Sequence, residues 1–220
     1  MILKGQNLYK HYENKPVING VSIVVNKAEI IAITGASGAG KTTLLNLLSG
    51  LEPPDNRSDS SLTLLNNDLL NCSEKAISNY RNKHMGFVFQ FHGLLDEFSA
   101  LENVMLPGKI AGQDHKILEE RALRLLQKMN VLGQKDQKPA TLSGGERQRV
   151  AVARSLINEP SIVFADEPSG NLDSINASQL FDMFSELREL TGTAFLMVTH
   201  DKNLAAKADR MITLENGQII

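Results

Sequence analysis

The stretch Gly35-Ala36-Ser37-Gly38-Ala39-Gly40-Lys41-Thr42 decides the fold of this chain, because two kinds of apolar pattern meet at it. Before it, residues 29–34 form a continuous apolar run, which is typical of a parallel strand buried on both faces. After it, residues 42–49 carry leucines at helical spacing, and Gly50 follows as a C-terminal cap. A buried strand, a glycine-rich turn and a helix in this order predict an α/β protein with a parallel sheet.

The same stretch has the pattern of a phosphate-binding P-loop. Its glycines allow backbone N–H groups to wrap phosphate oxygens at the start of a helix. Lys41 would reach the β- and γ-phosphates, Thr42 would ligate Mg²⁺, and Thr43 would bond the α-phosphate. An ordinary glycine-rich turn is the alternative, and the position between a buried strand and a helix makes it minor. The remaining phosphate contacts are expected from Gly35, Ser37, Gly38, Ala39 and Gly40.

Two adjacent carboxylates, Asp166 and Glu167, follow a second apolar strand that we expect over residues 161–165. Ligands of open α/β sheets bind at the carboxyl ends of the strands, so this position suits a partner of the P-loop. Asp166 would hold Mg²⁺, and Glu167 would polarise the water that attacks the γ-phosphate. A helix cap is the structural alternative for such a pair, and the all-apolar strand before it disfavours that alternative.

A second phosphate-binding device of different design is Leu142-Ser143-Gly144-Gly145-Glu146, which precedes an apolar helix expected over residues 147–157. Two glycines at a helix start let N–H groups converge on an anion, and the helix dipole adds partial positive charge there. One chain therefore carries two such devices, which suggests a nucleotide clamped between two subunits.

The composition indicates one well-cored domain. The chain has 220 residues, 42% of them hydrophobic, and its formal net charge of −2 gives no sign of nucleic-acid binding. Its single cysteine, Cys72, excludes an internal disulfide and fits a reducing compartment. No apolar run approaches the roughly 18 residues of a membrane span, and the first residues lack the apolar core of a signal peptide. We therefore expect a soluble chain of the cytoplasm.

Strand and helix patterns alternate on both sides of a long helical segment. Further strands are expected over residues 2–8, 17–25, 86–90 and 193–199, with a hairpin around Asn216-Gly217. Helices are indicated by the capping-box pair Ser99 and Glu102, by the spacing of Leu118, Ala122, Leu125 and Met129, and by a cap at Asp173 or Ser174. Because residues 91–157 lack strand signals, we divide the single domain 1–220 into a core with a β-subdomain (1–90 and 158–220) and an inserted helical subdomain (91–157).

The P-loop, Leu142–Glu146, Asp166-Glu167 and His200 occur in the order found in ABC ATPases, and the chain resembles this family over essentially its whole length. The five-residue signature is its most discriminating mark, since other P-loop proteins lack it. The resemblance implies a P-loop NTPase with a RecA-like core, an N-terminal antiparallel β-subdomain and an inserted helical subdomain. It also implies a head-to-tail dimer that binds two ATP molecules with Mg²⁺, each between the P-loop of one subunit and the signature of the other.

The resemblance assigns further roles residue by residue. Tyr12 stands where the family keeps an aromatic that stacks on adenine, with Tyr9 as the competitor and a plain strand-end tyrosine as the structural alternative. Gln90 resembles the glutamine that touches Mg²⁺ and the attacking water. His200 resembles the switch histidine that contacts the γ-phosphate. Asp173 resembles an aspartate that bridges the subunits, and it would also serve as a helix cap.

In the signature, the resemblance gives Ser143 and Gly145 a contact with the γ-phosphate of the opposite subunit's ATP. Gly144 and Glu146 complete the binding segment. Glu146 stands where many cassettes have glutamine. A second departure is the segment 55–67, which lacks the glycine-containing strand entry usual after the P-loop helix and puts its local turn in doubt. Neither departure removes a phosphate contact.

Two stretches narrow the kind of ABC ATPase. Residues 166–173 resemble the subgroup of lipoprotein-releasing, MacB-type and FtsE-type ATPases, and residues 90–104 closely resemble its lipoprotein-releasing members, as do residues 192–201. Separate permease subunits are expected to dock near Gln90–Val104. The docking surface would use an apolar cluster that core packing could explain in part, formed by Phe91, Leu94, Leu95 and Phe98.

The expected function is ATP hydrolysis that powers lipoprotein release, on the cytoplasmic face of the bacterial inner membrane. A MacB-like export ATPase and an FtsE-like cell-division ATPase without cargo are the alternatives. A soluble ABC ATPase of DNA repair or translation fits less well, because the sequence shows no coiled-coil insertion, second cassette or basic patch. The membrane partner would decide between the first two classes.

Overall fold

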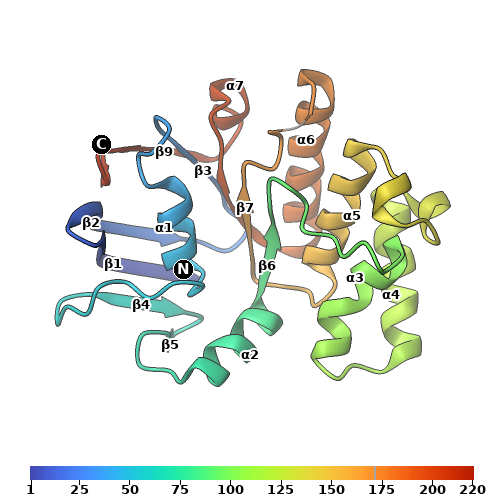
Figure 1. The fold of residues 1–220 in the computed structure, drawn as a ribbon, viewed down its shortest axis with the longest axis horizontal. Coiled ribbons are helices and arrows are strands. Elements are labelled where there is room, and N and C mark those ends of the chain that lie inside the picture. Colours follow the sequence, from blue (N-terminus) through green and yellow to red (C-terminus); the bar gives the residue numbers. More distant parts are fainter. Residues whose placement is uncertain (171) are drawn as a thin grey trace.

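The fold is a parallel sheet flanked by helices, with a smaller antiparallel sheet at one end (Figure 1). The structure, a computed structural model, describes residues 1–170 and 172–220. The larger sheet has six strands in the order β10-β9-β3-β8-β7-β6, and neighbours run parallel except at β10. Its strands are β3 (Ile30–Thr34), β6 (Met85–Val88), β7 (Ile162–Asp166), β8 (Ala194–Val198), β9 (Arg210–Glu215) and β10 (Gln218–Ile219). The predicted α/β class is confirmed.

The central strand β3 is buried on both faces, as its unbroken apolar run predicts. Ile31 and Ile33 pack with the leucines of α1, whereas Ile30 and Ala32 pack with the apolar side chains of α6. Successive strand residues point to opposite faces, so a strand covered by helices on both sides needs every residue apolar. The helices that belong to this part are α1 (Lys41–Leu48), α6 (Ser174–Thr191) and α7 (Lys202–Ala205).

The smaller sheet has the order β2-β1-β4-β5 and lies at the lower left of Figure 1. Its strands are β1 (Leu3–Tyr12), β2 (Lys15–Val25), β4 (Ser61–Leu64) and β5 (Asn67–Asp68). The two predicted N-terminal strands are confirmed and are longer than expected, because antiparallel pairing continues from Leu3 opposite Val25 to Tyr12 opposite Lys15. Tyr12 therefore ends a strand at the rim of the domain.

The segment 55–67 makes its turn without a glycine. Leu64 pairs with Asn67, so the loop between β4 and β5 consists of Leu65 and Asn66. Both have left-handed backbones, with φ of 49° and 66°. Two positive φ values are what a tight two-residue hairpin requires.

The chain between the small sheet and β6 differs from the prediction in two ways. The strand expected at residues 86–90 covers Met85–Val88, because pairing with β7 ends where Val88 lies opposite Ala165. Gln90 consequently lies in a turn and not in a strand. Helix α2 (Glu74–His84) was not predicted, and none of its residues is buried, so the sequence offers no apolar stripe to reveal it.

Residues 91–157 contain helices and no strand. The elements are α3 (Ala100–Ile110), α4 (His115–Lys128), η1 (Leu132–Gln134), η2 (Pro139–Thr141) and α5 (Gly144–Leu156). The predicted capping box of Ser99 and Glu102 begins α3. On α4 the fully buried face includes Leu126, whereas Leu125 is only partly buried. The subdomain boundaries at 90/91 and 157/158 stay a prediction.

The C-terminal elements agree with the sequence. Strand β8 matches the run predicted at 193–199, and the hairpin between β9 and β10 turns at Asn216 and Gly217, with φ of 48° and 76°. Asp173, rather than Ser174, is the residue that caps α6. In the part of the chain that the structure describes, no helix has the length and apolarity needed to cross a membrane.

Candidate functional site

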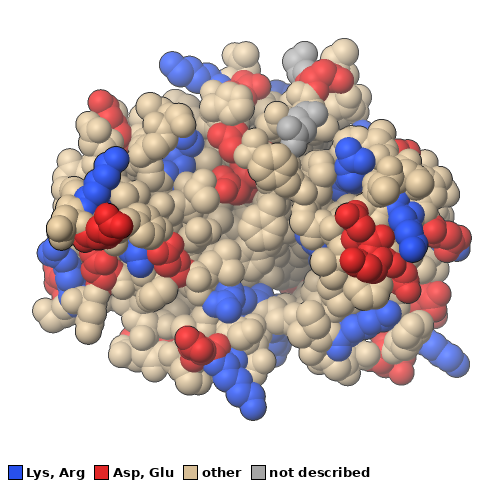
Figure 2. Space-filling view, in the orientation of Figure 1, with Lys and Arg blue, Asp and Glu red and all other residues tan. Residues whose placement is uncertain are grey.

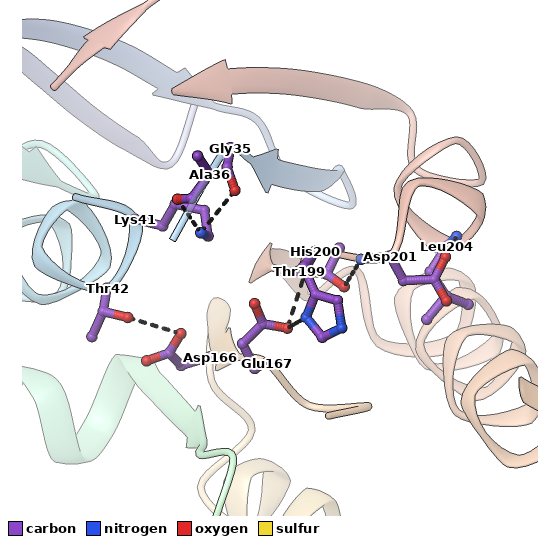
Figure 3. A network of polar contacts seen from close by, with 10 residues as sticks. All are labelled: Gly35, Ala36, Lys41, Thr42, Asp166, Glu167, Thr199, His200, Asp201 and Leu204. Atoms are coloured by element: carbon purple, nitrogen blue, oxygen red, sulfur yellow. Dashed lines mark hydrogen bonds and ion pairs between the residues drawn. The ribbon is translucent and has the colours of Figure 1, made fainter. Parts of the chain in front are cut away.

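The P-loop and the residues predicted to hold metal and to act on the γ-phosphate within one chain gather at the carboxyl edge of the large sheet (Figure 3). The P-loop follows β3, Asp166 ends β7, and His200 comes just after β8. These strands are parallel neighbours in the order β3-β8-β7, so their carboxyl ends meet at one edge. Figure 3 shows the side chains of Lys41, Thr42 and Glu167 around the same space.

The glycines of the P-loop are needed by the fold itself. Gly35, Gly38 and Gly40 have φ of 149°, 78° and 98°, a region that side chains rarely adopt. A Cβ on Gly35 would stand 2.2 Å from the backbone oxygen of Leu214, and one on Gly40 would stand 2.7 Å from that of Val17. At Gly38 an added Cβ would meet nothing within 4 Å. The P-loop thus packs closely against the backbone of other segments at Gly35 and Gly40, and it is open at Gly38.

Lys41 and Thr42 hold the start of α1 to the loop and to β7. The Nζ of Lys41 donates to the carbonyl oxygens of Gly35 and Ala36 at 2.9 and 3.0 Å. The hydroxyl of Thr42 donates to Oδ1 of Asp166 at 3.3 Å. Burial raises the pKa of Asp166, the Thr42 hydrogen bond lowers it, and the charge of Glu167 raises it again. A nearby cation would favour the ionised form of this carboxylate.

Glu167 and His200, predicted for separate roles, contact each other directly. Oε2 of Glu167 lies 2.8 Å from Nδ1 of His200 and accepts the backbone N–H of the same residue at 3.3 Å. Because a carboxylate only accepts, Nδ1 carries a ring proton. The backbone of Glu167 has φ of 45°, and its N–H donates to the Val198 oxygen at 3.0 Å. This strained turn directs the carboxylate to the end of β8.

Gln90 lies beside the segment that follows Glu167. A Cβ on Gly170 would stand 3.2 Å from Nε2 of Gln90 and 3.3 Å from the backbone oxygen of Glu167. The turn after β6 therefore reaches the same edge. Asp173 accepts the N–H of Asn176 at 2.8 Å, so it acts as the helix cap that was weighed as its alternative role. Asn171, in the same stretch, lies outside the described residues.

The signature forms the capped start of α5. The hydroxyl of Ser143 accepts the N–H of Glu146 at 3.3 Å, and the carboxylate of Glu146 accepts the N–H of Ser143 at 2.7 Å. This capping box satisfies two N–H groups of the first turn. A Cβ on Gly144 or Gly145 would meet nothing within 4 Å. The carboxylate of Glu146 is thus committed to the helix start, and the glycines face open space.

Within one chain, the signature and the P-loop lie apart. Helix α5 packs on α3, α4 and β6, and β6 is the edge strand farthest from β10. In Figure 1, α1 lies to the left of β7 and β6 and α5 to their right. The structure brings Lys41, Thr42, Asp166, Glu167 and His200 together, and it does not bring Ser143 or Gly145 to them.

The two candidate tyrosines have different surroundings. Tyr12 is partly exposed, and its hydroxyl donates to Glu52 at 2.7 Å. Burial and this hydrogen bond raise the pKa of Tyr12, and the Thr43 side chain lowers it, which places Thr43 of α1 nearby. The ring of Tyr9 is covered by the guanidinium of Arg57, 3.8 Å from its centroid. Of the two candidates, Tyr12 is favoured by its side-chain contact with Thr43 of the P-loop helix.

Sequence reasoning missed three residues near the site. Glu52 accepts a hydrogen bond from Tyr12, although the two residues are 40 positions apart in the sequence. His92 contacts Gln148, which is 56 positions away. No local pattern links residues so far apart. The pairs become visible only once the sheet and α5 are in place.

The comparisons with known proteins agree with this architecture. A family model described as "ABC transporter" matches residues 18–170. The lipoprotein-releasing system ATP-binding protein LolD of Bacteroides thetaiotaomicron is 45% identical over 218 residues, which are 99% of both chains. The LolD protein of Cytophaga hutchinsonii is also 45% identical, over all of this chain and 99% of its own.

Solved structures give the same result. The dimeric structure of MJ0796, described as a bacterial ABC transporter cassette, has a TM-score of 0.90 at 32% identity and covers 99% of this chain and 96% of its own. A post-hydrolysis state of MJ0796 bound to ADP and Pi has a TM-score of 0.89 at 31% identity, with the same coverage. With the family model and full-length relatives in agreement, the chain belongs to the ABC transporter family of ATP-binding cassettes.

Proposed function

We propose that this chain is the ATP-hydrolysing subunit of a system that releases lipoproteins from the inner membrane towards the outer membrane. The observation that carries the ATPase mechanism is the carboxyl edge, where the Thr42–Asp166 contact and the Glu167–His200 contact face the P-loop. The full-length similarity to relatives named as lipoprotein-releasing ATP-binding proteins supports the choice of cargo.

The residues at this edge fit Mg²⁺. Thr42 Oγ1 and Asp166 Oδ1 lie 3.3 Å apart, close enough for one ion to be held by both, directly or through water. The described residues contain no group of three or more His, Cys, Asp and Glu that could hold a metal by themselves. Water, phosphate oxygens and Gln90 would supply the other ligands, as is usual for Mg²⁺. Bound there, the ion would neutralise charge on the phosphates.

Glu167 is the proposed general base. The ring of His200 holds Oε2, which leaves Oε1 to accept a proton from the attacking water. A base or water-orienting carboxylate typically contributes about 10²–10⁴ in rate. His200 is 73% exposed, so its Nε2 is accessible to a γ-phosphate.

On nucleotide binding, Lys41 would exchange its carbonyl acceptors for phosphate oxygens. Its Nζ donates to the carbonyl oxygens of Gly35 and Ala36, at the mouth of the loop. Phosphate oxygens carry more negative charge than carbonyl oxygens, so β- and γ-phosphates in the loop would take over these hydrogen bonds. We assign Lys41 to charge stabilisation of the transferring phosphoryl group.

A second copy of the chain would complete the site. Neither packing nor a left-handed backbone requires glycine at positions 144 and 145, so the surface above these two residues is open to another molecule. The start of α5 carries partial positive charge and free N–H groups, which suit the γ-phosphate of ATP held by another subunit. The opposite positions of α1 and α5 support a head-to-tail dimer with Ser143 and Gly145 in this contact.

Membrane subunits would dock in the groove beside β6. A cavity of about 310 Å³ is lined by residues of α2, β6, α3 and α5, Ile110 among them, and by Phe89 and Gly93 of the turn after β6. Figure 2 shows the molecule hollowed near its centre, with basic side chains at the edge of the hollow; Arg81 and Arg154 are among the residues that line the cavity. Phe91, 80% exposed, projects from the turn between Phe89 and Gly93. Of the predicted docking cluster, Leu94 packs against the core instead.

This docking would place the chain on the cytoplasmic face of the membrane without a span of its own. The partner decides between lipoprotein release and the MacB-like or FtsE-like alternatives. Co-purification with a lipoprotein-releasing permease supports the proposed cargo. A division-type or export permease in its place overturns the cargo and leaves the ATPase assignment intact.

The variant Glu167→Gln tests the hydrolysis mechanism. It keeps the size of the side chain and an acceptor for His200, and it removes the base. We expect ATP binding to persist, hydrolysis to fall by at least about 10²-fold, and an Mg·ATP-dependent dimer to accumulate in size-exclusion chromatography. Only monomer under these conditions, alone and with the membrane subunits, would refute the two-subunit site.

The signature contact is tested with two substitutions at Ser143. Ser143→Arg adds bulk and charge and removes a cap worth about 1 kcal/mol. Ser143→Asp is the matched control, because aspartate also caps helices but repels phosphate. Both should bind ATP as monomers and fail to form the dimer. Lost ATP binding by a folded monomer of either variant contradicts the cross-subunit assignment.

A further inference from the structure

The turn after Gln90 is tied to the signature helix by a buried pair of side chains. His92 is only 8% exposed, although it follows the exposed Phe91. Its Nδ1 contacts Oε1 of Gln148, which lies in α5 and is 1% exposed. The backbone of His92 has φ of 61°, a left-handed conformation that histidine adopts more readily than most residues. The turn therefore sends this one side chain inward.

Helix α5 holds the same turn at a second point. Arg154 donates from Nη2 to the carbonyl oxygen of His92 at 2.7 Å and from Nη1 to that of Gly93 at 2.5 Å. A planar guanidinium that bonds two successive carbonyls fixes their orientation as well as their distance. With Gln148 and Arg154 both engaged, we expect the turn and α5 to move as one body.

The His92–Gln148 contact has a defined polarity. Since the amide oxygen of Gln148 only accepts, Nδ1 of His92 carries a ring proton and donates it. Nε2 of Gln148 is buried and has no hydrogen-bond partner among the residues that the structure describes. A buried amide whose two N–H donors are unused costs stability, so packing alone would favour an apolar residue here.

Gln148 also lies where three functional segments meet. Its helix begins at the signature. At a rise of about 1.5 Å per residue, Gln148 lies about 7.5 Å along the helix axis from Ser143. It lines a cavity of about 10 Å³ together with Gly145 and with Leu172, which belongs to the segment after Glu167. Through His92 it reaches the turn of Gln90, which lies beside Gly170.

We propose that His92 and Gln148 are positioning residues of the ATPase, which fix the angle of the signature helix to the Gln90 turn. Neither touches nucleotide. A nucleotide bound at Gln90 moves the turn, the pair transmits that movement to α5, and Ser143 and Gly145 take their places against the second copy's ATP. The inference rests on the proposed function, since it presumes a site completed by a second copy.

Three variants separate this role from a packing role. His92→Ala removes the donor. Gln148→Met keeps the volume, and it removes both the acceptor and the unpartnered donor. His92→Asn is the rescue, because asparagine tolerates the left-handed backbone and places an amide N–H near the position of Nδ1. His84→Ala is the matched control, a half-buried histidine whose ring lies 4.7 Å from that of Tyr80.

The full chain is assayed for three quantities: affinity of the monomer for a fluorescent ATP analogue, kcat for ATP, and the Mg·ATP concentration that gives half dimer in the Glu167→Gln background. For His92→Ala and Gln148→Met we expect unchanged monomer affinity, kcat lowered roughly tenfold and the half-dimer concentration raised roughly tenfold. His92→Asn should recover most of both losses. The double variant should lose no more than one single variant, because the two residues act as one unit.

Wild-type kcat in His92→Ala, a double variant whose loss is the product of the single losses, or His92→Asn as poor as His92→Ala would each overturn the proposal. Should His92→Ala not fold, Gln148→Met and His92→Asn carry the same test. Failure of the two-subunit site looks different, because the Glu167→Gln chain without further substitutions would then form no Mg·ATP-dependent dimer.

Discussion

Gly145→Ala should stabilise the chain and at the same time remove most of its ATPase activity. A Cβ at this position meets no atom within 4 Å, and the backbone is not left-handed, so the methyl group adds no strain. Replacing glycine by alanine in a helix gains about 0.5–1 kcal/mol, mostly by restricting the unfolded chain. For a chain of 220 residues this corresponds to a rise in Tm of about 1–4 °C.

The loss of activity follows from the open space itself. In the proposed dimer, the N–H groups at the start of α5 approach phosphate oxygens of the second copy's ATP. Such hydrogen bonds need a donor–acceptor distance of about 2.7–3.2 Å, which a methyl group on the same residue obstructs. Loss of one pre-organised donor at a reacting centre costs about 10²–10³ in kcat. We therefore expect a fall of about 10²-fold, with nucleotide binding by the monomer unchanged.

Two other glycines serve as controls in the same thermal melts and steady-state ATPase assays. Gly133 also has nothing within 4 Å of an added Cβ and lies outside the site, so Gly133→Ala should match the gain in Tm and keep full activity. Gly35→Ala would place its Cβ 2.2 Å from the Leu214 oxygen, so it should lower Tm and lose nucleotide binding. Full ATPase activity in Gly145→Ala, or a fall in its Tm, refutes the reasoning.

Three further outcomes are expected. The hydrogen bonds from the side chain and backbone of Ser143 hold the pKa of Glu146 below 4.5, so its stabilisation is present above that pH and lost as pH falls through the lower folded-state pKa. The Tm difference between wild type and Glu146→Gln should therefore shrink below about pH 4.5 in thermal melts, and a constant difference contradicts this. Tyr12→Ala should raise KM for ATP about tenfold through lost stacking, whereas Tyr9→Ala should not; the reverse result would reassign the adenine contact. Asn103 is buried, and its amide group forms hydrogen bonds with three carbonyl oxygens and one N–H of residues 95–99. Asn103→Ala should therefore lower the free energy of unfolding in urea by about 2–3 kcal/mol. A loss below about 1 kcal/mol would argue against a structural role for these hydrogen bonds.

Most of the fold could be predicted because its signals are local. An all-apolar run, a glycine loop and a leucine-rich helix occupy adjacent positions, and the capping box of Ser99 and Glu102 is equally local. Helix α2 escaped prediction because none of its residues is buried, so it has no apolar stripe. The end of β6 was placed too late because Phe89, directly after Val88, is still apolar although pairing with β7 has stopped.

The site could be predicted residue by residue but not contact by contact. Glu167 and His200 were each identified from their positions at strand ends, yet their direct contact depends on β7 and β8 being neighbours. The His92–Gln148 pair joins a turn to a helix that begins 52 residues further on, and neither residue stands out in its own segment. Contacts of this kind belong to the tertiary structure, and a local pattern contains no information about them.

The P-loop and the signature are both glycine-rich in the sequence, but their glycines have different surroundings in the structure. Gly35 and Gly40 are fixed by close approach to Leu214 and Val17, so the P-loop is complete within one chain. Gly144 and Gly145 are free of such approach, so the start of the signature helix is open on its outer side. Because these two surfaces lie on opposite sides of β7 and β6, a twofold arrangement of two copies would bring each P-loop to the other copy's signature and form two equivalent sites at once. In such an arrangement each ATP site needs residues from both copies, and neither site forms without the other. ATP hydrolysis would then depend on dimerisation because of where one chain places its P-loop and its signature.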